Sequence, residues 1–139
     1  MDYGKLKKSL KHLELQLQNH LSAKGRAELS SIDREAIAES VVQRFETCYD
    51  MVWKDVKQHL LSELGLPDVP NSPKPIFKLA AQNKLLPSAT ERWLEYADLR
   101  VSTAHDYSGE KAAAVVGAAE RFVGDAIRLY EKLSGKGWE

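Results

Sequence analysis

The sequence predicts an all-α protein, an antiparallel four-helix up-and-down bundle with one additional short helix. Leucines near the amino terminus recur at alternating steps of three and four residues, the period of a helix stripe. Residues 33–64 contain neither glycine nor proline, and no segment alternates with the period of two that a strand requires. At 139 residues the chain is long enough to bury about two-thirds of its unfolded surface. We therefore expect residues 1–139 to form a single domain.

The first helix is predicted from residue 3 to the break near Gly25, where a polar segment with two serines follows. Lysines and glutamines occupy most of its other positions, so one face packs and the rest faces water. Its apolar stripe consists of Leu6, Leu10, Leu13, Leu17 and Leu21.

The second helix is predicted to begin near Ser31 or Asp33, either of which can cap it, and to continue to about Leu64. Its apolar sector is wide enough to meet several neighbours, as the central helix of a bundle does. Any exposed part of this sector is a candidate dimer surface. The sector consists of Ile37, Val41, Phe45, Cys48, Val52, Val56 and Leu60, flanked by Val42, Tyr49, Trp53 and Leu61.

Prolines and glycine separate this helix from a predicted short helix that begins at Pro73, with Ser72 as its cap, and ends near Asn83. The next helix is predicted to start with a capping box formed by Ser88 and Glu91 and to end by about residue 107. Its expected buried residues are Trp93, Tyr96, Ala97 and Val101. The last helix is predicted over residues 110–133, with an alanine-rich stripe that permits close packing.

The charge balance excludes a long-range attraction to polyanions, because twenty basic and twenty acidic residues cancel. The single cysteine, Cys48, excludes an internal disulfide and is consistent with a reducing compartment. The amino-terminal segment lacks the apolar core of a signal peptide, and no apolar run reaches the roughly 20 residues of a membrane span. We expect a soluble, cytoplasmic protein that does not bind membranes.

The segment from Arg100 to Tyr107, RVSTAHDY, concentrates the reactive side chains of the chain at the end of a predicted helix. On a continuous helix, Arg100 and His105 would point about 140 degrees apart, so they share a face only if the helix loosens before His105. An arginine beside a histidine suits metal-free RNA cleavage, in which imidazole takes the 2′-hydroxyl proton and guanidinium stabilises the phosphorane. The alternative is an ordinary helix end whose carbonyls these side chains cap.

The other polar features have simple interpretations. We expect His12, His20 and His59 to lie solvated on helix surfaces. A basic strip on the first helix is either a soluble face or a phosphate-binding patch; it consists of Lys5, Lys7, Lys8 and Lys11. There is no glycine-rich phosphate loop and no zinc-spaced cluster of cysteine and histidine, so neither a metal nor a cofactor is predicted.

Three strings, VVQRFETCYDMVWKDVKQHL, NSPKPIFKLAAQNKLL and WLEYADLRVSTAHDY, resemble the HEPN superfamily. The closest resemblance is to its branch of nucleotidyltransferase substrate-binding proteins, or HepT-like toxins. That branch carries an arginine, four residues, a histidine, one residue and a tyrosine at the end of a bundle helix, which Arg100, His105 and Tyr107 match. Asp50, Trp53 and Lys54 fall in the family's central helix.

The resemblance implies a homodimer paired with a minimal nucleotidyltransferase encoded nearby. Arg100 and His105 would be the ribonuclease residues, and adenylylation of Tyr107 would silence the toxin. Two departures affect this expectation: Val101 stands where the family often has a polar residue, and Asp50 stands where it often has glutamate. The supporting residues Asp50, Trp53 and Lys54 contribute either to the chemistry or to the structure of the bundle alone.

Three functional hypotheses follow from these patterns. The first is a HepT-like, metal-independent ribonuclease toxin controlled through Tyr107. The second is a non-catalytic subunit that binds a nucleotidyltransferase or presents its substrate. The third is a helical interaction module in which the motif is only a helix end. RNA is a candidate partner under the first hypothesis alone.

Overall fold

The computed structural model describes residues 1–103 and 109–139, and this part of the chain contains five helices and no strand. The prediction of an all-α bundle with one short helix is confirmed. The helices are α1 (Gly4–Ala23), α2 (Ser31–Ser62), α3 (Pro73–Gln82), α4 (Thr90–Thr103) and α5 (Gly109–Ser134).

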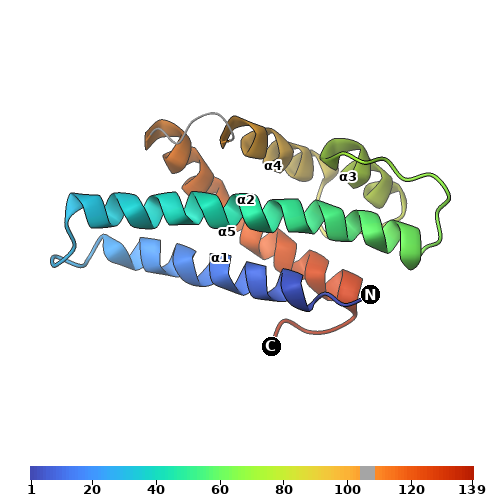
Figure 1. Cartoon of the computed structure of the whole chain (residues 1–139), viewed down its shortest axis with the longest axis horizontal. Coiled ribbons are helices and arrows are strands. Elements are labelled where there is room, and N and C mark those ends of the chain that lie inside the picture. The colour runs from blue at the N-terminus through green and yellow to red at the C-terminus, as the bar shows by residue number, and fades with distance from the viewer. Residues whose placement is uncertain (104–108) are drawn as a thin grey trace.

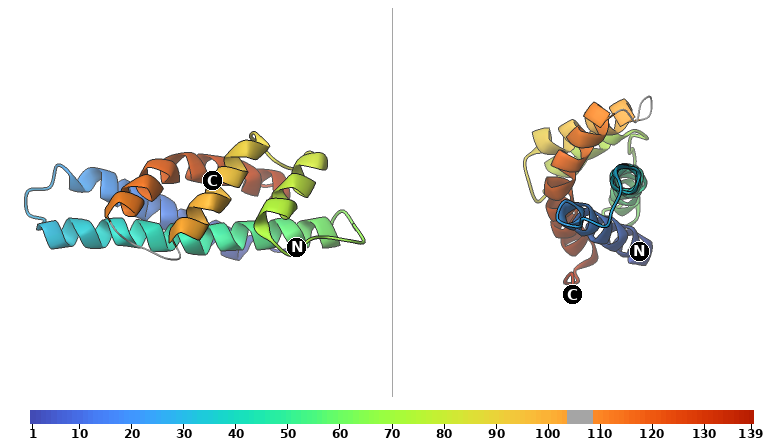
Figure 2. Two further views of the ribbon diagram at one scale, coloured as in Figure 1. Left: turned by 90° about the horizontal axis from the view of Figure 1, so that it is seen from above. Right: turned by 90° about the vertical axis from the view of Figure 1, so that its left-hand side faces the viewer.

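Helix α2 is the centre of the bundle and contacts each of the other four helices. Figure 1 shows α1 and α2 side by side and antiparallel, with α3 and α4 on the other side of α2 and α5 crossing behind it. The end-on view in Figure 2 shows how α5 closes the bundle between α1 and α4. The wide apolar sector of α2 is therefore used within the protomer, and most of it is buried there.

The core is organised around Phe122 of α5, whose ring contacts four other aromatic rings. Its centroid lies 5.1 Å from that of Phe45 and 5.2 Å from that of Tyr96, both nearly edge to face, the arrangement that aromatic quadrupoles favour. Tyr49 and Trp93 complete this contact shell. The cluster joins α2, α4 and α5 at the level of the first half of α4, which contains Trp93 and Tyr96.

The predicted helix boundaries hold to within a few residues, while two predicted caps are different. Ser30, not Ser31, caps α2. Its hydroxyl accepts a hydrogen bond from the Asp33 amide, and the Asp33 carboxylate accepts one from the Ser30 amide, which completes a capping box. Ser88 lies before α4, and its hydroxyl receives a hydrogen bond from the Trp93 indole. The predicted end of α4 falls at residues 104–108, outside the described residues.

Three burial predictions are wrong. Leu21, in the last turn of α1, is 47% exposed because Ala23, and not Leu21, occupies the buried side of that turn. Val101 is 62% exposed because it lies on the other side of the last turn of α4 from Thr103, which is buried and bonds to Glu46 of α2. His59 is buried, and its Nδ1 lies 2.6 Å from the Tyr3 hydroxyl. His12 is exposed as predicted, and Cys48 is fully buried, which raises the pKa of its thiol to about 12.

The described residues lack two kinds of feature, a membrane-spanning helix and a cluster of metal ligands. No described helix combines the length and the apolar composition needed to cross a membrane. Within the same residues, no group of three histidine, cysteine or acidic side chains is arranged to hold a metal ion.

Candidate functional site

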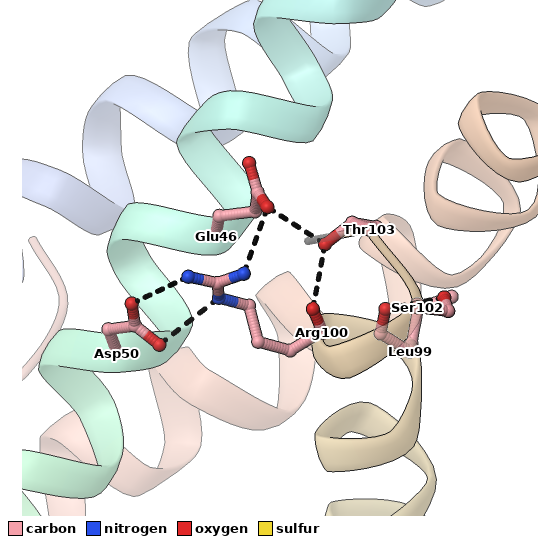
Figure 3. Close-up of polar contacts among 6 residues, drawn as sticks. All are labelled: Glu46, Asp50, Leu99, Arg100, Ser102 and Thr103. Atoms are coloured by element: carbon pink, nitrogen blue, oxygen red, sulfur yellow. Dashed lines mark hydrogen bonds and ion pairs between the residues drawn. The ribbon is translucent and has the colours of Figure 1, made fainter. Parts of the chain in front are cut away.

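Arg100, in the last turn of α4, turns its guanidinium toward α2 and binds two carboxylates there (Figure 3). Its Nε and Nη2 donate to the two oxygens of Asp50 at 3.2 and 3.1 Å, the two-pronged geometry in which arginine binds a carboxylate most specifically. Its Nη1 donates to Glu46 Oε2 at 2.9 Å. The guanidinium is thereby fixed in position, with 26% of the side chain exposed.

Glu46 lies one turn before Asp50 on α2 and is the more buried of the two carboxylates. Its Oε2 also receives a hydrogen bond of 2.9 Å from the Thr103 hydroxyl. Glu46, Asp50, Arg100 and Thr103 form one hydrogen-bonded unit that ties the end of α4 to the middle of α2; we call it the Arg100 cluster. Its formal charge is −1, because two carboxylates meet one guanidinium.

The carbonyls at the end of α4 are bonded by hydroxyl groups. Ser102 donates to the Leu99 carbonyl oxygen at 2.7 Å, and Thr103 donates to the Arg100 carbonyl oxygen at 2.9 Å. Such bonds from serine and threonine satisfy acceptors that a helix end leaves without an amide partner. Arg100 points across to α2 instead (Figure 3), so the alternative in which it caps its own helix is wrong for this residue.

A groove of about 600 Å³ runs beside the Arg100 cluster, between α2, α3 and α4; we call it the α3–α4 groove. Its volume falls within the range of small-molecule sites. Exposed Val101 lines it, which gives this residue a surface role in place of the predicted core role. The lining residues are Tyr49, Asp50, Trp53, Ser72, Pro73, Lys74, Pro75, Ala97, Arg100 and Val101.

Tyr49 lines this groove, and its hydroxyl is buried and has no hydrogen-bond partner among the described residues. Burial raises the pKa of this phenol, and the charge of the neighbouring Asp50 raises it further, so it remains protonated at neutral pH. A buried hydroxyl without a partner is uncommon, because it loses its hydrogen bonds with water. Tyr49 therefore combines a position in the groove wall with a buried hydroxyl that the described side chains do not satisfy.

The predicted supporting residues occupy different positions around the site. Asp50 belongs to the Arg100 cluster, and Trp53 is partly buried against the core while it lines the α3–α4 groove. Lys54 is exposed, with its Nζ 5.7 Å from the Trp53 ring centroid; in the described part of the chain it contacts Trp53 and not Arg100. His105 and Tyr107 lie outside the described residues, so the structure does not place them relative to Arg100.

Sequence reasoning missed two members of the cluster, Glu46 and Thr103. Glu46 had a usable signal, since it precedes Asp50 by four residues and so shares its helix face. Thr103 had none, because the bond to Glu46 joins residues 57 positions apart. The spacing of Glu46 and Asp50 can be seen in the sequence, whereas the packing of α4 against α2 cannot.

Fold and site together define an all-helical bundle with an arginine-centred polar cluster beside a ligand-sized groove. The chain belongs to the family described as nucleotidyltransferase substrate binding protein like, whose model matches residues 1–135. The resemblance to the HepT-like, substrate-binding branch is thus confirmed at the level of the family.

Individual relatives agree with this assignment. A probable ribonuclease HepT from Haemophilus influenzae is 29% identical over 105 residues, which cover 74% of this chain and 71% of the relative. The fold matches a Haemophilus influenzae structure, described as the substrate-binding domain of a nucleotidyltransferase, with a TM-score of 0.85. That match has 24% identity and covers 96% of this chain and 99% of the other. A Thermus thermophilus structure matches with a TM-score of 0.64 and 27% identity, over 94% and 96% of the two chains.

Proposed function

We propose that this protein is the helical partner subunit of a minimal nucleotidyltransferase encoded nearby, in a toxin–antitoxin-like pair. The match of residues 1–135 to the substrate-binding family supports the partnership, and its extent supports a single domain over residues 1–139. The pair would act in the cytoplasm.

The proposed activity of this subunit is metal-independent cleavage of RNA. The observation that carries the proposal is the guanidinium of Arg100, fixed by Asp50 and Glu46 five residues before His105. In the proposed reaction, His105 takes the proton of a ribose 2′-hydroxyl, and the resulting oxygen attacks the adjacent phosphorus. The 5′-oxygen leaves and takes a proton from water, His105 returns its proton to water, and the other product ends in a 2′,3′-cyclic phosphate. Arg100 stabilises the negative charge that develops on the phosphoryl oxygens.

The second candidate function is a non-catalytic subunit that binds the nucleotidyltransferase or presents its substrate. The bonds of the Arg100 cluster favour this candidate, because Asp50 and Glu46 already occupy the guanidinium that a phosphate would have to bind. Under this alternative the cluster holds α4 against α2, and the α3–α4 groove receives the substrate or the partner.

Tyr107 is the proposed control point of the ribonuclease. Transfer of an adenylyl group from ATP to its phenolic oxygen would release pyrophosphate and place a phosphodiester near the end of α4. That phosphate would compete with RNA for Arg100. A second copy of the chain is a further proposed partner, and the exposed Val101 with the partly buried Trp53 marks its candidate contact surface.

The ribonuclease proposal is tested with purified protein and single-stranded RNA in the presence of EDTA. Cleaved products with 2′,3′-cyclic phosphate ends are expected from the wild type and not from His105→Ala. Intact RNA under these conditions, from a protein that still binds the nucleotidyltransferase, would instead select the non-catalytic subunit. Loss of that binding as well would reject the partnership.

A further inference from the structure

A second groove, separate from the α3–α4 groove, lies between α1 and α2; we call it the α1–α2 groove. One part has a volume of about 310 Å³ and is lined by Lys5, Lys8, Ser9, His12, Arg44, Thr47 and Met51. A smaller hollow of about 250 Å³ shares His12 and Arg44 and continues past Gln16 to Asn19. From Lys5 to Asn19 the helix rises about 21 Å, so the two hollows form one elongated track along α1.

The charged residues that line this groove are all basic. Lys5, Lys8 and Arg44 are exposed, and no carboxylate lines either hollow. None of these three cations forms an ion pair with a carboxylate of the described residues. In a chain with no net charge, three cations without carboxylate neighbours make a local positive site.

The basic strip predicted on α1 is therefore divided into two parts. Lys7 and Lys11 lie over aromatic rings, with Lys11 Nζ 4.3 Å from the Trp138 ring centroid and Lys7 Nζ 5.8 Å from that of Tyr130. These two lysines pack against the end of the chain. Lys5 and Lys8 line the α1–α2 groove, where Arg44 joins them from α2.

Apart from the apolar Met51 and Leu15, the remaining lining residues are types that bind phosphate and sugar groups. Arginine, lysine, serine, threonine, asparagine and glutamine make most protein contacts to nucleic-acid backbones, and Ser9, Thr47 and Gln16 belong to this set. Lys5, Lys8 and His12 follow one another on one helix face at rises of about 4.5 and 6 Å. Those steps are of the same order as the rise of one strand along a duplex axis, about 3.4 Å per nucleotide.

We propose that the α1–α2 groove binds the phosphate backbone of the single-stranded RNA substrate; the choice of RNA rests on the proposed ribonuclease function. Thr47 and Met51 follow Glu46 and Asp50 in sequence, so the groove and the Arg100 cluster occupy neighbouring faces of α2, about 100° apart. Figure 1 shows α1 and α4 on opposite sides of α2. A strand held in the groove reaches Arg100 by crossing this one helix, about 10–12 Å wide with its side chains. The groove thus positions RNA, and it is not itself a catalytic site.

The test measures RNA affinity separately from cleavage. In the full-length His105→Ala background, binding of a fluorescein-labelled 12-nucleotide single-stranded RNA is followed by anisotropy across a series of KCl concentrations. The test variant carries Lys5→Gln, Lys8→Gln and Arg44→Gln. The matched control carries Lys78→Gln, Lys84→Gln and Lys132→Gln, which make the same charge change at exposed positions outside both grooves. Thermal unfolding verifies that all proteins are folded, as expected for exposed substitutions.

The test variant is expected to bind RNA at least about tenfold more weakly at low salt, while the control remains within about twofold. Loss of three phosphate contacts reduces the slope of log affinity against log salt by about 2, at about 0.7 for each phosphate of a single strand. Equal affinities in the test variant and the parent, or equal losses in the test and control variants, would overturn the proposal. Unchanged RNA binding with a weakened nucleotidyltransferase complex would also overturn it and assign the groove to an acidic protein surface. Because the parent is catalytically silent, absence of cleavage by the wild type does not affect the result.

Discussion

Asp50 receives two hydrogen bonds from Arg100, at 3.2 Å from Nε and 3.1 Å from Nη2. This pairing resolves one of the two departures from the family pattern. Aspartate is one methylene shorter than the glutamate common at this position, yet it reaches the guanidinium with both oxygens. Glu46, one turn earlier, adds the second carboxylate. The change to aspartate therefore does not remove the carboxylate contact that holds Arg100.

Asp50→Asn is expected to loosen Arg100, because the amide nitrogen places a donor against a guanidinium donor. The free energy of unfolding should fall by about 1 kcal/mol, a modest loss since 37% of the Asp50 side chain is exposed. For the proposed ribonuclease, kcat should fall about tenfold or more while KM does not rise, because a negative charge near the phosphate has been removed. Steady-state cleavage assays measure kcat and KM separately, with Asp68→Asn as a control at an exposed position. Unchanged kcat would show that Asp50 does not position Arg100 for catalysis.

Arg100→Lys is expected to destabilise the fold even though it retains the charge. One ammonium cannot make both bonds to Asp50 and the bond to Glu46, so the largely buried Glu46 loses its cation. We expect a loss of about 1–2 kcal/mol in urea unfolding. Arg121→Lys, at an exposed position of α5, should change stability by less than about 0.5 kcal/mol. Similar midpoints for the two variants would mean that the two-carboxylate contact adds no stability.

The helical fold is largely readable from the sequence because its signals are local. The leucine spacing of the first helix and the uninterrupted second helix predicted two antiparallel neighbours. Pro73 located the start of the short helix, although the predicted side-chain cap by Ser72 is not formed. Val101 shows where that logic fails. It follows Ala97 by four residues, so periodicity predicts that both are buried. Periodicity contains no information about which side of the last turn of α4 a neighbouring helix covers, and α2 covers the side of Thr103.

The site is less predictable because its contacts join distant segments. Arg100 was identified by its motif, but its partners are 50 and 54 residues away. His59 was expected on the surface because its sequence neighbours are polar, and its partner Tyr3 is 56 residues away. In both cases the residue type was visible in the sequence, whereas the environment was decided by helix packing.

The buried pair Tyr3 and His59 predicts an acid-sensitive connection between the start of α1 and the end of α2. Burial lowers the pKa of His59 below its unfolded value of 6.5, so the unfolded chain binds more protons below that pH. Stability contributed by neutral His59 is complete above about pH 6.5 and is lost as pH falls below it. The wild-type Tm should therefore fall more between pH 7.5 and 5.5 than that of His59→Asn. His12→Asn, at an exposed position, should show the same dependence of Tm on pH as the wild type. The same dependence in His59→Asn would show that His59 does not cause the loss of stability in acid.

Asp125 is a fully buried carboxylate that sequence periodicity did not single out. It accepts hydrogen bonds from the Tyr96 hydroxyl at 2.6 Å, from Arg92 at 3.3 Å and from Arg128, and so joins α4 to α5. Asp125→Ala would leave the buried Tyr96 hydroxyl without its acceptor and is expected to cost about 2–4 kcal/mol. Denaturant unfolding of Asp125→Ala, compared with Tyr96→Phe and the double variant, measures the coupling. Additive losses would show that the Tyr96 bond contributes nothing specific.

We propose that one site, Arg100 with His105, cleaves RNA without metal and is controlled through Tyr107. The direct measurement is analysis of RNA ends in EDTA, using protein before and after treatment with the nucleotidyltransferase and ATP followed by removal of that enzyme and its metal. We predict 2′,3′-cyclic phosphate ends from untreated wild type and none after treatment. Tyr107→Phe should cleave in both samples, and Arg100→Ala in neither. Intact RNA with untreated wild type, or the same loss of cleavage for treated Tyr107→Phe, would contradict the account.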